Sequence, residues 1–215
     1  MKKLNILYED KYLLIINKPA KILSVSTNNE KEKTAFHEVY EYIKNKNKRN
    51  KIFIVHRLDY DTSGILIFAK NEEVKYLLQN KWDKVERCYA AVVCGNVEKQ
   101  NETIKSYLKE TSTLITYSTN KKDGKLAITN YNKILSNDLY TLLEINIKTG
   151  RKNQIRVHMK DIGHPIIGDK KYNSNLNPIN RLALHANYIK FTHPITKKDI
   201  EIDIDIPDSF INLFK

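Results

Sequence analysis

Short apolar blocks separated by polar ones run along most of this chain, and most of the blocks have the length of β-strands. Apolar runs that are rich in Val, Ile, Tyr and Thr and bounded by Asn, Asp, Gly or Lys predict strands. Apolar residues at helical spacing occur near residues 35–46, 72–82 and 155–162. Many strands, about three helices and no repeated βαβ unit favour the α+β class. Strands are predicted at residues 4–8, 12–16, 52–55, 65–69, 85–94, 111–117, 127–135, 140–148 and 200–206.

Capping residues mark the expected ends of the three helices. Thr34 is a suitable N-cap for the first helix, and Asn71 can cap the second. Gly163 follows the third helix where a left-handed residue commonly ends a helix, and Pro165 lies just beyond it. The sequence therefore predicts helix boundaries as well as helix positions.

One polar block stands between two apolar runs, in the order His56-Arg57-Leu58-Asp59-Tyr60-Asp61-Thr62-Ser63-Gly64. A loop held at both ends by buried strands is a common position for catalytic groups. Composition alone also fits an ordinary turn, because Asp, Thr, Ser and Gly are favoured in turns. The order of the residues decides between these interpretations.

The order His-Arg-Leu-Asp-x-x-Thr-Ser-Gly, followed by an apolar strand and Ala-Lys, resembles the central motif of the RluA family of pseudouridine synthases. Other stretches resemble further motifs of that family, namely residues 10–20, 89–95, 149–172, 182–186 and 191–194. Position 153 departs from the usual pattern, since the family has His where this chain has Asn153. We therefore expect no proton-transfer role for that residue.

The resemblance assigns roles to individual residues. It implies that Asp59 is the catalytic nucleophile and that Arg156 pairs with it. Tyr89 would stack on the target base and is a candidate acid or base. Among the RNA- or base-binding positions, Arg57 would fill the gap left by a flipped nucleotide or hold its phosphate, and Ile155 would pack beneath the base. The full set of expected RNA- or base-binding residues is His56, Arg57, Thr62, Ser63, Gly64, Arg151, Gln154 and Ile155.

The activity implied by the resemblance is isomerisation of a specific uridine in rRNA, tRNA or both to pseudouridine, with the base flipped out of the RNA. The residue types suit this chemistry. An Asp carboxylate is ionised at neutral pH and can act as a nucleophile, and a nearby arginine favours its charged form. The implied fold is a mixed, largely antiparallel sheet in two lobes flanked by helices, with a cleft between the lobes. Residues 1–215 would be a single catalytic domain without the accessory RNA-binding domain that many relatives carry.

Composition agrees with an RNA partner without proving one. The chain has 215 residues and a formal net charge of +12, which suggests a polyanionic partner, although lysines scattered over a solvated surface give the same total. Cys88 and Cys94 are six positions apart on one predicted strand, about 20 Å, which is too far for a disulfide. With no apolar run long enough for a bilayer and no secretory signal at the start, we expect a cytoplasmic monomer that binds no membrane.

Two other functions remain open from the sequence. The chain could be a catalytically silent RNA-binding protein, or an enzyme that cleaves glycosides with Asp59. Glycosidases normally use two carboxylates, and only Asp61 lies close in sequence. No cluster of Cys and His and no phosphate-binding glycine loop is present, so we expect neither a metal nor a cofactor.

Overall fold

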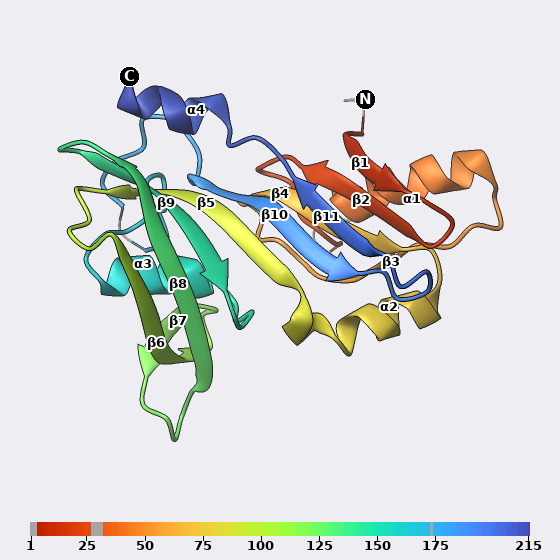
Figure 1. Ribbon diagram of the computed structural model, residues 1–215, viewed down its shortest axis with the longest axis horizontal. Helices are drawn as coiled ribbons and strands as arrows, with labels where there is room; N and C mark the ends of the chain where they lie inside the picture. The colour runs from red at the N-terminus through yellow and green to blue at the C-terminus, as the bar shows by residue number, and fades with distance from the viewer. Residues whose placement is uncertain (1–3, 27–31, 173) are drawn as a thin grey trace. The chain divides into compact units, whose positions relative to one another are not determined.

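A computed structural model of the protein describes residues 4–26, 32–172 and 174–215 (Figure 1). The chain forms two compact units. Unit 1 contains the chain up to Val85 together with Tyr188–Ile204, and unit 2 contains Glu86–Asn187 together with Asp205–Lys215. Each unit combines mainly antiparallel strands with a few helices, which confirms the predicted α+β class.

Unit 1 is built on a small antiparallel sheet. The β1–β2 hairpin pairs through β2 with β4, with Leu13 opposite Ala69 and Lys18 opposite Gly64. The short β3 pairs with β4 as well, and β11 pairs with the end of β10. The strands are β1 (Ile6–Glu9), β2 (Leu13–Lys18), β3 (Phe53–Ile54), β4 (Ser63–Ala69), β11 (Asp199–Asp203) and the part of β10 (Leu184–Thr192) from Tyr188 on, since the first residues of β10 belong to unit 2.

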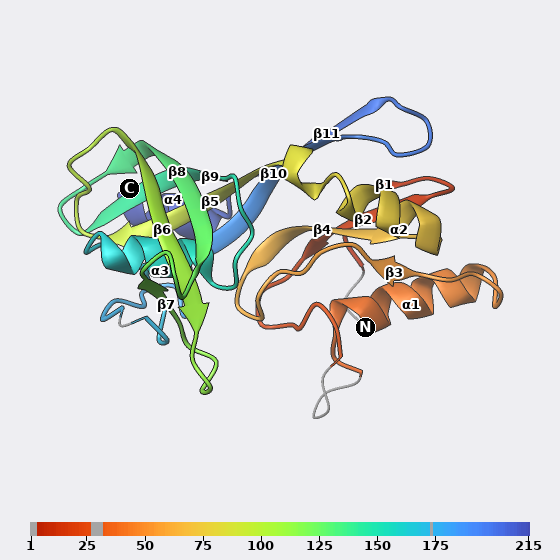
Figure 2. The same ribbon diagram turned by 90° about the horizontal axis from the view of Figure 1, so that it is seen from below.

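Two helices cover opposite faces of the β2 and β4 strands (Figure 2). The helix α1 (Ala35–Lys46) reaches the face of Phe68, because the rings of Phe36 and Phe68 lie 6.4 Å apart. The helix α2 (Glu72–Gln79) packs with Ile67, on the other side of the pleat, in one hydrophobic cluster. All seven residues of β4 are therefore buried.

The capping residues predicted from the sequence are confirmed. The side chain of Thr34 accepts from the backbone of His37 at the start of α1, and Asn71 does the same for Val74 at the start of α2. The second helix is shorter than predicted, since it ends at Gln79 and a 3-10 turn covers Trp82–Lys84. The backbone at Lys81, with φ −115° and ψ 20°, is not helical and separates the two.

Unit 2 is a five-stranded antiparallel sheet in the order β5-β9-β8-β6-β7. Its helix α3 (Gln154–Asp161) is the third predicted helix, and Gly163 follows with the expected left-handed φ of +86°. The helix α4 (Asp208–Ile211) and a 3-10 turn (Asn212–Phe214) lie near the end of the chain. The strands are β5 (Glu86–Cys94), β6 (Asn101–Glu110), β7 (Thr116–Thr119), β8 (Lys125–Ser136) and β9 (Tyr140–Ile147).

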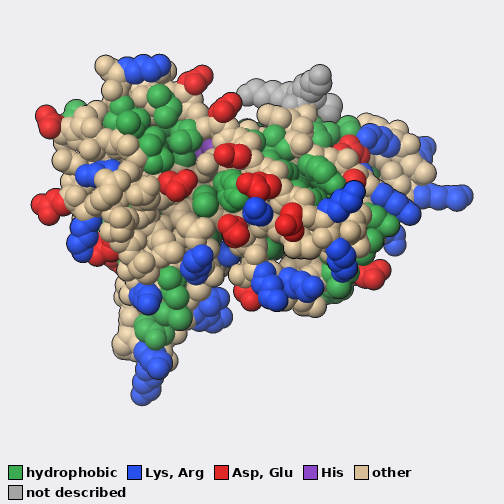
Figure 3. Space-filling view, in the orientation of Figure 1, with side chains coloured by type: hydrophobic (Ala, Val, Ile, Leu, Met, Phe, Trp, Pro, Cys, Tyr) green, Lys and Arg blue, Asp and Glu red, His purple; other side chains and the backbone are tan. Residues whose placement is uncertain are grey.

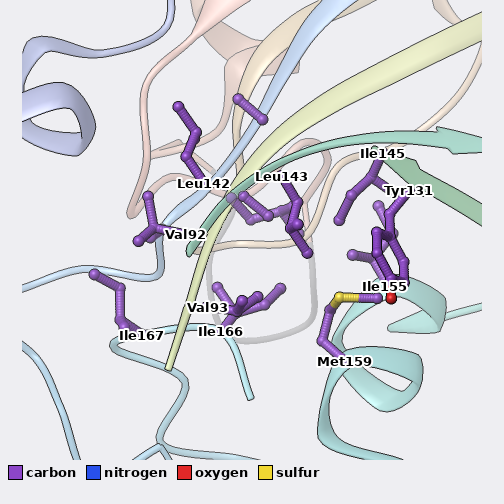
Figure 4. Close-up of a cluster of buried hydrophobic side chains, with 14 of the residues drawn as sticks. Val92, Val93, Tyr131, Leu142, Leu143, Ile145, Ile155, Met159, Ile166 and Ile167 are labelled. Carbon is purple, nitrogen blue, oxygen red and sulfur yellow. The ribbon is translucent and has the colours of Figure 1, made fainter. Parts of the chain in front are cut away.

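The core of unit 2 lies between α3 and the sheet (Figure 4). Ile155 and Met159 from α3 lie beside Tyr131 of β8, while Ile166 lies beside Val93 of β5. Both Met159 and Ile166 are fully buried. The helix that carries Arg156 is thus fixed to the sheet by its apolar side.

Three strand predictions were wrong in detail. Residues 111–115 form a turn instead of a strand, because the hydroxyl of Thr111 accepts from the backbone of Ile115 and Leu114 adopts a φ of +62°. The strand before this turn, β6, is rich in Asn, Glu and Lys and gave no clear apolar signal. The predicted buried strand 52–55 is only Phe53–Ile54 and half-buried, and the predicted strand 200–206 ends at Asp203.

Candidate active site

Unit 1 holds the polar block between β3 and β4, and a neighbouring segment of the chain braces it. The hydroxyl of Ser24 donates to the carbonyl of Leu58 at 2.7 Å and accepts from its amide at 3.0 Å. The amide of Lys21 donates to the carbonyl of Tyr60 at 2.8 Å, and Thr62 donates to the carbonyl of Asp59. The residues on both sides of Asp59 are therefore anchored, while its own side chain is half-buried.

Lys18 is part of this brace and was not singled out from the sequence. Its side chain is fully buried, and Nζ donates to the carbonyls of Pro19 at 2.9 Å and Ile22 at 2.8 Å and approaches that of Tyr60 at 3.5 Å. A buried ammonium is costly unless it is hydrogen-bonded, so these carbonyls must be held around it. Lys18 thereby links the motif at residues 10–20 to Tyr60, the residue that follows Asp59.

His56 fixes the start of the same loop. Its Nε2 accepts from the backbone amide of Ile67 at 3.2 Å, which requires a neutral ring. The ring also packs on Trp82, with centroids 4.7 Å apart and planes inclined at 31°. These contacts support a structural role for His56, and its contact with RNA stays a prediction.

The end of the loop is buried. Thr62 and Ser63 are only 2% and 4% exposed. Gly64 has a φ of +116°, in the region that favours glycine, where the chain enters β4. These three residues shape the loop exit, and their predicted contact with RNA remains untested. Arg57, in contrast, is exposed, and among the described residues it has no hydrogen-bond or ion-pair partner.

Unit 2 holds Arg156, which is buried on α3 against a carboxylate. Nε and Nη2 donate to the two carboxylate oxygens of Asp169 at 2.8 and 2.7 Å, a bidentate pair. Nη1 donates to Oδ1 of Asn153 at 3.1 Å, and the ring of Tyr172 lies 5.2 Å from the guanidinium carbon. These bonds use three of the five N–H donors of the arginine and fix its plane. The predicted pairing with Asp59, which belongs to unit 1, stays a prediction.

Asp169 and Tyr172 are functional candidates that the sequence analysis did not name. Both belong to the Gly-Asp-x-x-Tyr segment at residues 168–172, which was matched only as part of a motif. The side chain of Asp169 is 0% exposed and also accepts from the backbone amides of Lys171 and Tyr172. A buried carboxylate with this many donors positions Arg156 firmly.

The backbone geometry at position 153 is compatible with the Asn that this chain has there. Asn153 precedes α3 with φ 53° and ψ 19°, a left-handed conformation. Asn and His are among the non-glycine residues that adopt it most readily, so either can occupy the position. Its side chain accepts from Arg156.

Gln154 uses all of its hydrogen-bonding capacity inside the protein. Nε2 donates to the carbonyl of Ile128 and to Oγ1 of Thr129, both at 3.0 Å. Oε1 accepts from the hydroxyl of Thr149 at 2.7 Å and from the amide of Arg151 at 3.0 Å. Gln154 thus ties α3 to β8, and a contact with RNA, which stays a prediction, would replace one of these bonds.

The two residues expected to hold the base share one cluster in unit 2. Ile155 is 6% exposed and belongs to the core between α3 and the sheet, and Tyr89 is half-buried and packs against that core from β5. Arg151, also expected to bind RNA, is exposed, and its Nε donates to the carbonyl of Leu126 at 3.0 Å.

On the face drawn in Figure 3, Lys and Arg side chains are interspersed with Asp and Glu.

A buried histidine of α3, His158, contacts two strands of the unit 2 sheet, β8 and β6. Nδ1 of His158 lies 2.8 Å from Oγ1 of Thr129, and Nε2 lies 2.9 Å from Oγ of Ser106. Burial lowers the pKa of His158 to about 4, and burial followed by the charge of Arg181 lowers the pKa of His185 to about 4. Both rings are therefore neutral in the folded protein at pH 7.

We predict that the protein loses stability between pH 7 and pH 5. Both histidines have a pKa in the folded state below the unfolded value of 6.5, so the unfolded chain binds protons first as the pH falls. The free energy of unfolding should drop by about 2 kcal/mol per histidine over this interval. Urea denaturation at several pH values measures the drop, and His158→Gln should make it smaller. A free energy of unfolding that stays constant over this interval would contradict the prediction.

Among the described residues, no group of three His, Cys, Asp or Glu side chains is arranged to hold a metal ion. In the same part of the chain, no helix is long and apolar enough to cross a membrane. Cys88 and Cys94 are free and lie on the same strand, as predicted.

Comparison with known proteins identifies the class of this fold. Human RNA pseudouridylate synthase domain containing 4 superposes with a TM-score of 0.80 at 20% identity, covering 96% of this chain and 90% of the other. Human RNA pseudouridylate synthase domain containing 1 superposes with a TM-score of 0.77 at 22% identity, covering 100% and 87%. The fold is therefore that of a pseudouridine synthase.

Sequence similarity narrows the class to a family. The family model described as RNA pseudouridylate synthase matches residues 12–161. An uncharacterized RNA pseudouridine synthase of Bacillus subtilis, YjbO, is 33% identical over 99% of this chain and 76% of its own length. The tRNA pseudouridine synthase C of Haemophilus ducreyi is 33% identical over 99% and 95%, and the ribosomal large subunit pseudouridine synthase C of Buchnera aphidicola is 40% identical over 92% and 66%. The chain belongs to the RluA family of RNA pseudouridine synthases, which are isomerases.

Proposed function

We propose that this protein isomerises a uridine of rRNA or tRNA to pseudouridine, with Asp59 as the nucleophile and with the target base flipped out of the RNA. The names of its relatives support both RNA classes. The observation that carries the proposal is the loop around Asp59, in which anchored neighbours hold a half-buried carboxylate in place. Fixed geometry of this kind is what a nucleophile needs, because attack requires close and aligned atoms.

The proposed reaction needs only side chains. The Asp59 carboxylate supplies an electron pair to the sugar carbon as the bond from that carbon to N1 of uracil breaks. The uracil turns, and its C5 forms a new bond to the same carbon and displaces Asp59. The hydrogen on C5 leaves as a proton and N1 gains one, so no oxidant or reductant is consumed.

Residues of unit 2 would complete the site. The guanidinium of Arg156 would keep Asp59 ionised, because a nearby cation favours the charged form of a carboxylate. Asp169 and Asn153 support this role by fixing the plane of the guanidinium. Tyr89 and Ile155 would contact the two faces of the flipped base, as aromatic and apolar side chains do in other enzymes that flip bases.

The release of tritium from C5 tests this function. RNA transcripts of rRNA and tRNA labelled with tritium at C5 of uracil are incubated with the purified full-length protein. Pseudouridine formation must release the label to water, whereas RNA binding alone or glycoside hydrolysis leaves it on the uracil. Release of labelled water in proportion to the enzyme concentration supports the proposal. If neither rRNA nor tRNA transcripts release labelled water, the proposal is contradicted.

We predict that Arg57→Ala impairs turnover more on a folded stem-loop than on an unstructured oligomer with the same target. Unstacking a base costs a few kcal/mol in a stem, and a long guanidinium can fill the vacated space while it bonds to phosphate. The side chain is exposed and, among the described residues, has no partner that would occupy it. Single-turnover rates on the two RNAs measure the difference. Equal losses on both would leave Arg57 as a general phosphate contact.

A further inference from the structure

Unit 1 contains a pocket that the proposed reaction does not use. It has a volume of about 260 Å³ and lies between the end of α2 and the turn that joins β10 to β11. Its floor is apolar, with Leu77, Leu78, Val85 and Phe191 among the lining residues. The volume is just below the usual range of about 300–1,000 Å³ for small-molecule sites, so it suits one planar ring system. None of the residues around Asp59 lines it.

Lysines surround this apolar floor. Lys81, Lys84 and Lys197 line the pocket and are exposed, and on the face drawn in Figure 3 basic side chains gather near α2. In the described part of the chain, Lys81 and Lys84 have no carboxylate partner, and Nζ of Lys197 donates to the carbonyl of Pro194 at 2.6 Å. Asp83 stands between the first two in sequence but does not line the pocket. The rim therefore carries positive charge that the protein itself does not neutralise.

The turn on one side of the pocket is held in a fixed shape. The ring of His193 is fully buried, and its Nδ1 accepts from the backbone amides of Ile195 and Thr196 at 3.1 and 3.0 Å. Its Nε2 lies 3.1 Å from a carboxylate oxygen of Asp10. Because this ring ties the turn to the β1–β2 hairpin, the pocket is preformed.

We propose that this pocket binds one unpaired nucleobase of the substrate RNA, distinct from the uridine that Asp59 attacks. The base would pack on the apolar floor, and the phosphates on either side of it would lie against Lys81, Lys84 and Lys197. This inference rests on the proposed function, which supplies RNA as the ligand. It adds a second point of recognition that requires a single-stranded nucleotide at a fixed distance from the target.

The charge pattern favours RNA over an acidic peptide. A nucleotide combines a flat ring of the size of the pocket with a phosphate on each side, which matches an apolar floor inside a basic rim. An acidic peptide would need a large apolar side chain flanked by carboxylates in the same arrangement. Both ligands are compared in the test.

Binding of a defined RNA probe tests the inference on the full-length protein. The probe is a fluorescein-labelled oligouridine of twelve nucleotides, and a second probe has the same phosphates but no bases. The double variant Lys81→Ala/Lys84→Ala should raise the Kd for oligouridine about tenfold. It should also reduce the slope of the logarithm of the binding constant against the logarithm of the salt concentration by about 1.4. Leu77→Trp, which fills the pocket, should reduce the preference for the base-bearing probe, and the part that remains comes from the site of the flipped uridine.

A matched control separates the pocket from net charge. Lys99→Ala/Lys190→Ala removes the same charge from two lysines that pair with Glu102 and Glu201, and it should change the Kd less than twofold. If the pocket double variant behaves like this control, the inference is wrong. Tighter binding of an alternating Glu-Phe peptide than of oligouridine, weakened by the same variants, would overturn the choice of RNA.

Tritium release keeps this test independent of the proposed function. If the parent protein releases tritium but the pocket variants bind RNA normally, the pocket inference fails and the function stands. If the parent releases none and the pocket variants still weaken RNA binding, the function fails and the pocket inference stands. Thermal unfolding of each variant shows whether it is folded. If Leu77→Trp is not folded, the result with the lysine variants alone decides the test.

Discussion

Asp59→Asn should abolish pseudouridine formation while the protein stays folded. The amide has nearly the volume of the carboxylate but is not a nucleophile, and loss of a nucleophile reduces turnover by at least about 10⁴-fold in comparable enzymes. The anchors bind backbone carbonyls and amides of the loop, which the substitution leaves in place. The half-buried side chain should therefore change the free energy of unfolding by less than about 1 kcal/mol.

Single-turnover tritium release measures this loss, and Asp61 supplies the matched control. Asp61 lies two residues further along the same loop and is also half-buried. Asp61→Asn removes the same charge from the same loop and should keep the rate within a few-fold of the parent. Turnover by folded Asp59→Asn protein at a rate close to that of Asp61→Asn would rule out Asp59 as the nucleophile.

Arg156→Lys should lower the rate by about a hundredfold or more, although it preserves the positive charge. The arginine contacts Asp169 through two parallel hydrogen bonds, which an ammonium cannot reproduce. A lysine at this position would lose the fixed orientation that these bonds give the guanidinium. The acid limb of the pH–rate profile should also move to higher pH, because a cation that is no longer fixed in place stabilises the ionised nucleophile less.

The shift of the pH–rate profile distinguishes this role from a structural one. A lysine that merely loosened α3 would lower the rate at every pH without moving the acid limb. Lys160→Ala, one helical turn further on the exposed side of α3, is the control and should leave both rate and profile unchanged. If Arg156→Lys matched the parent in rate and profile, the pairing of Arg156 with Asp59 would have to be abandoned.

Local sequence signals predicted much of the framework of the site. The helix ends at Thr34, Asn71 and Gly163 follow from side-chain and backbone preferences of single residues, and the structure confirms them. The loop that carries Asp59 follows from the apolar runs on either side of it. Features of this kind depend only on neighbours in the sequence, so the sequence alone was enough to find them.

The supports of the site come from distant parts of the chain and could not be predicted in this way. Lys18 approaches a carbonyl 42 positions away, and Ser24 bonds to a residue 34 positions away. The partner of Arg156, Asp169, is 13 positions further on, beyond the end of its helix. Nothing in the local pattern of polar residues indicates which of them meet after folding.

A family motif also does not distinguish residues that contact a ligand from residues that hold those ligand-contacting residues in place. Gln154 and Arg57 were both assigned to RNA binding from their motifs. The structure shows that Gln154 is saturated by four internal hydrogen bonds, whereas Arg57 is exposed. Both residues match their motif positions equally well. Their different surroundings depend on burial and hydrogen bonding in the fold, which the motif does not contain.

The most direct test of the central claim is a map of pseudouridines in rRNA and tRNA from cells with and without the gene. We predict that at least one pseudouridine disappears without the gene, returns when the parent protein is expressed, and does not return with Asp59→Asn. Identical maps with and without the gene would contradict the proposed function. Restoration of the missing pseudouridine by Asp59→Asn would contradict the assignment of the nucleophile.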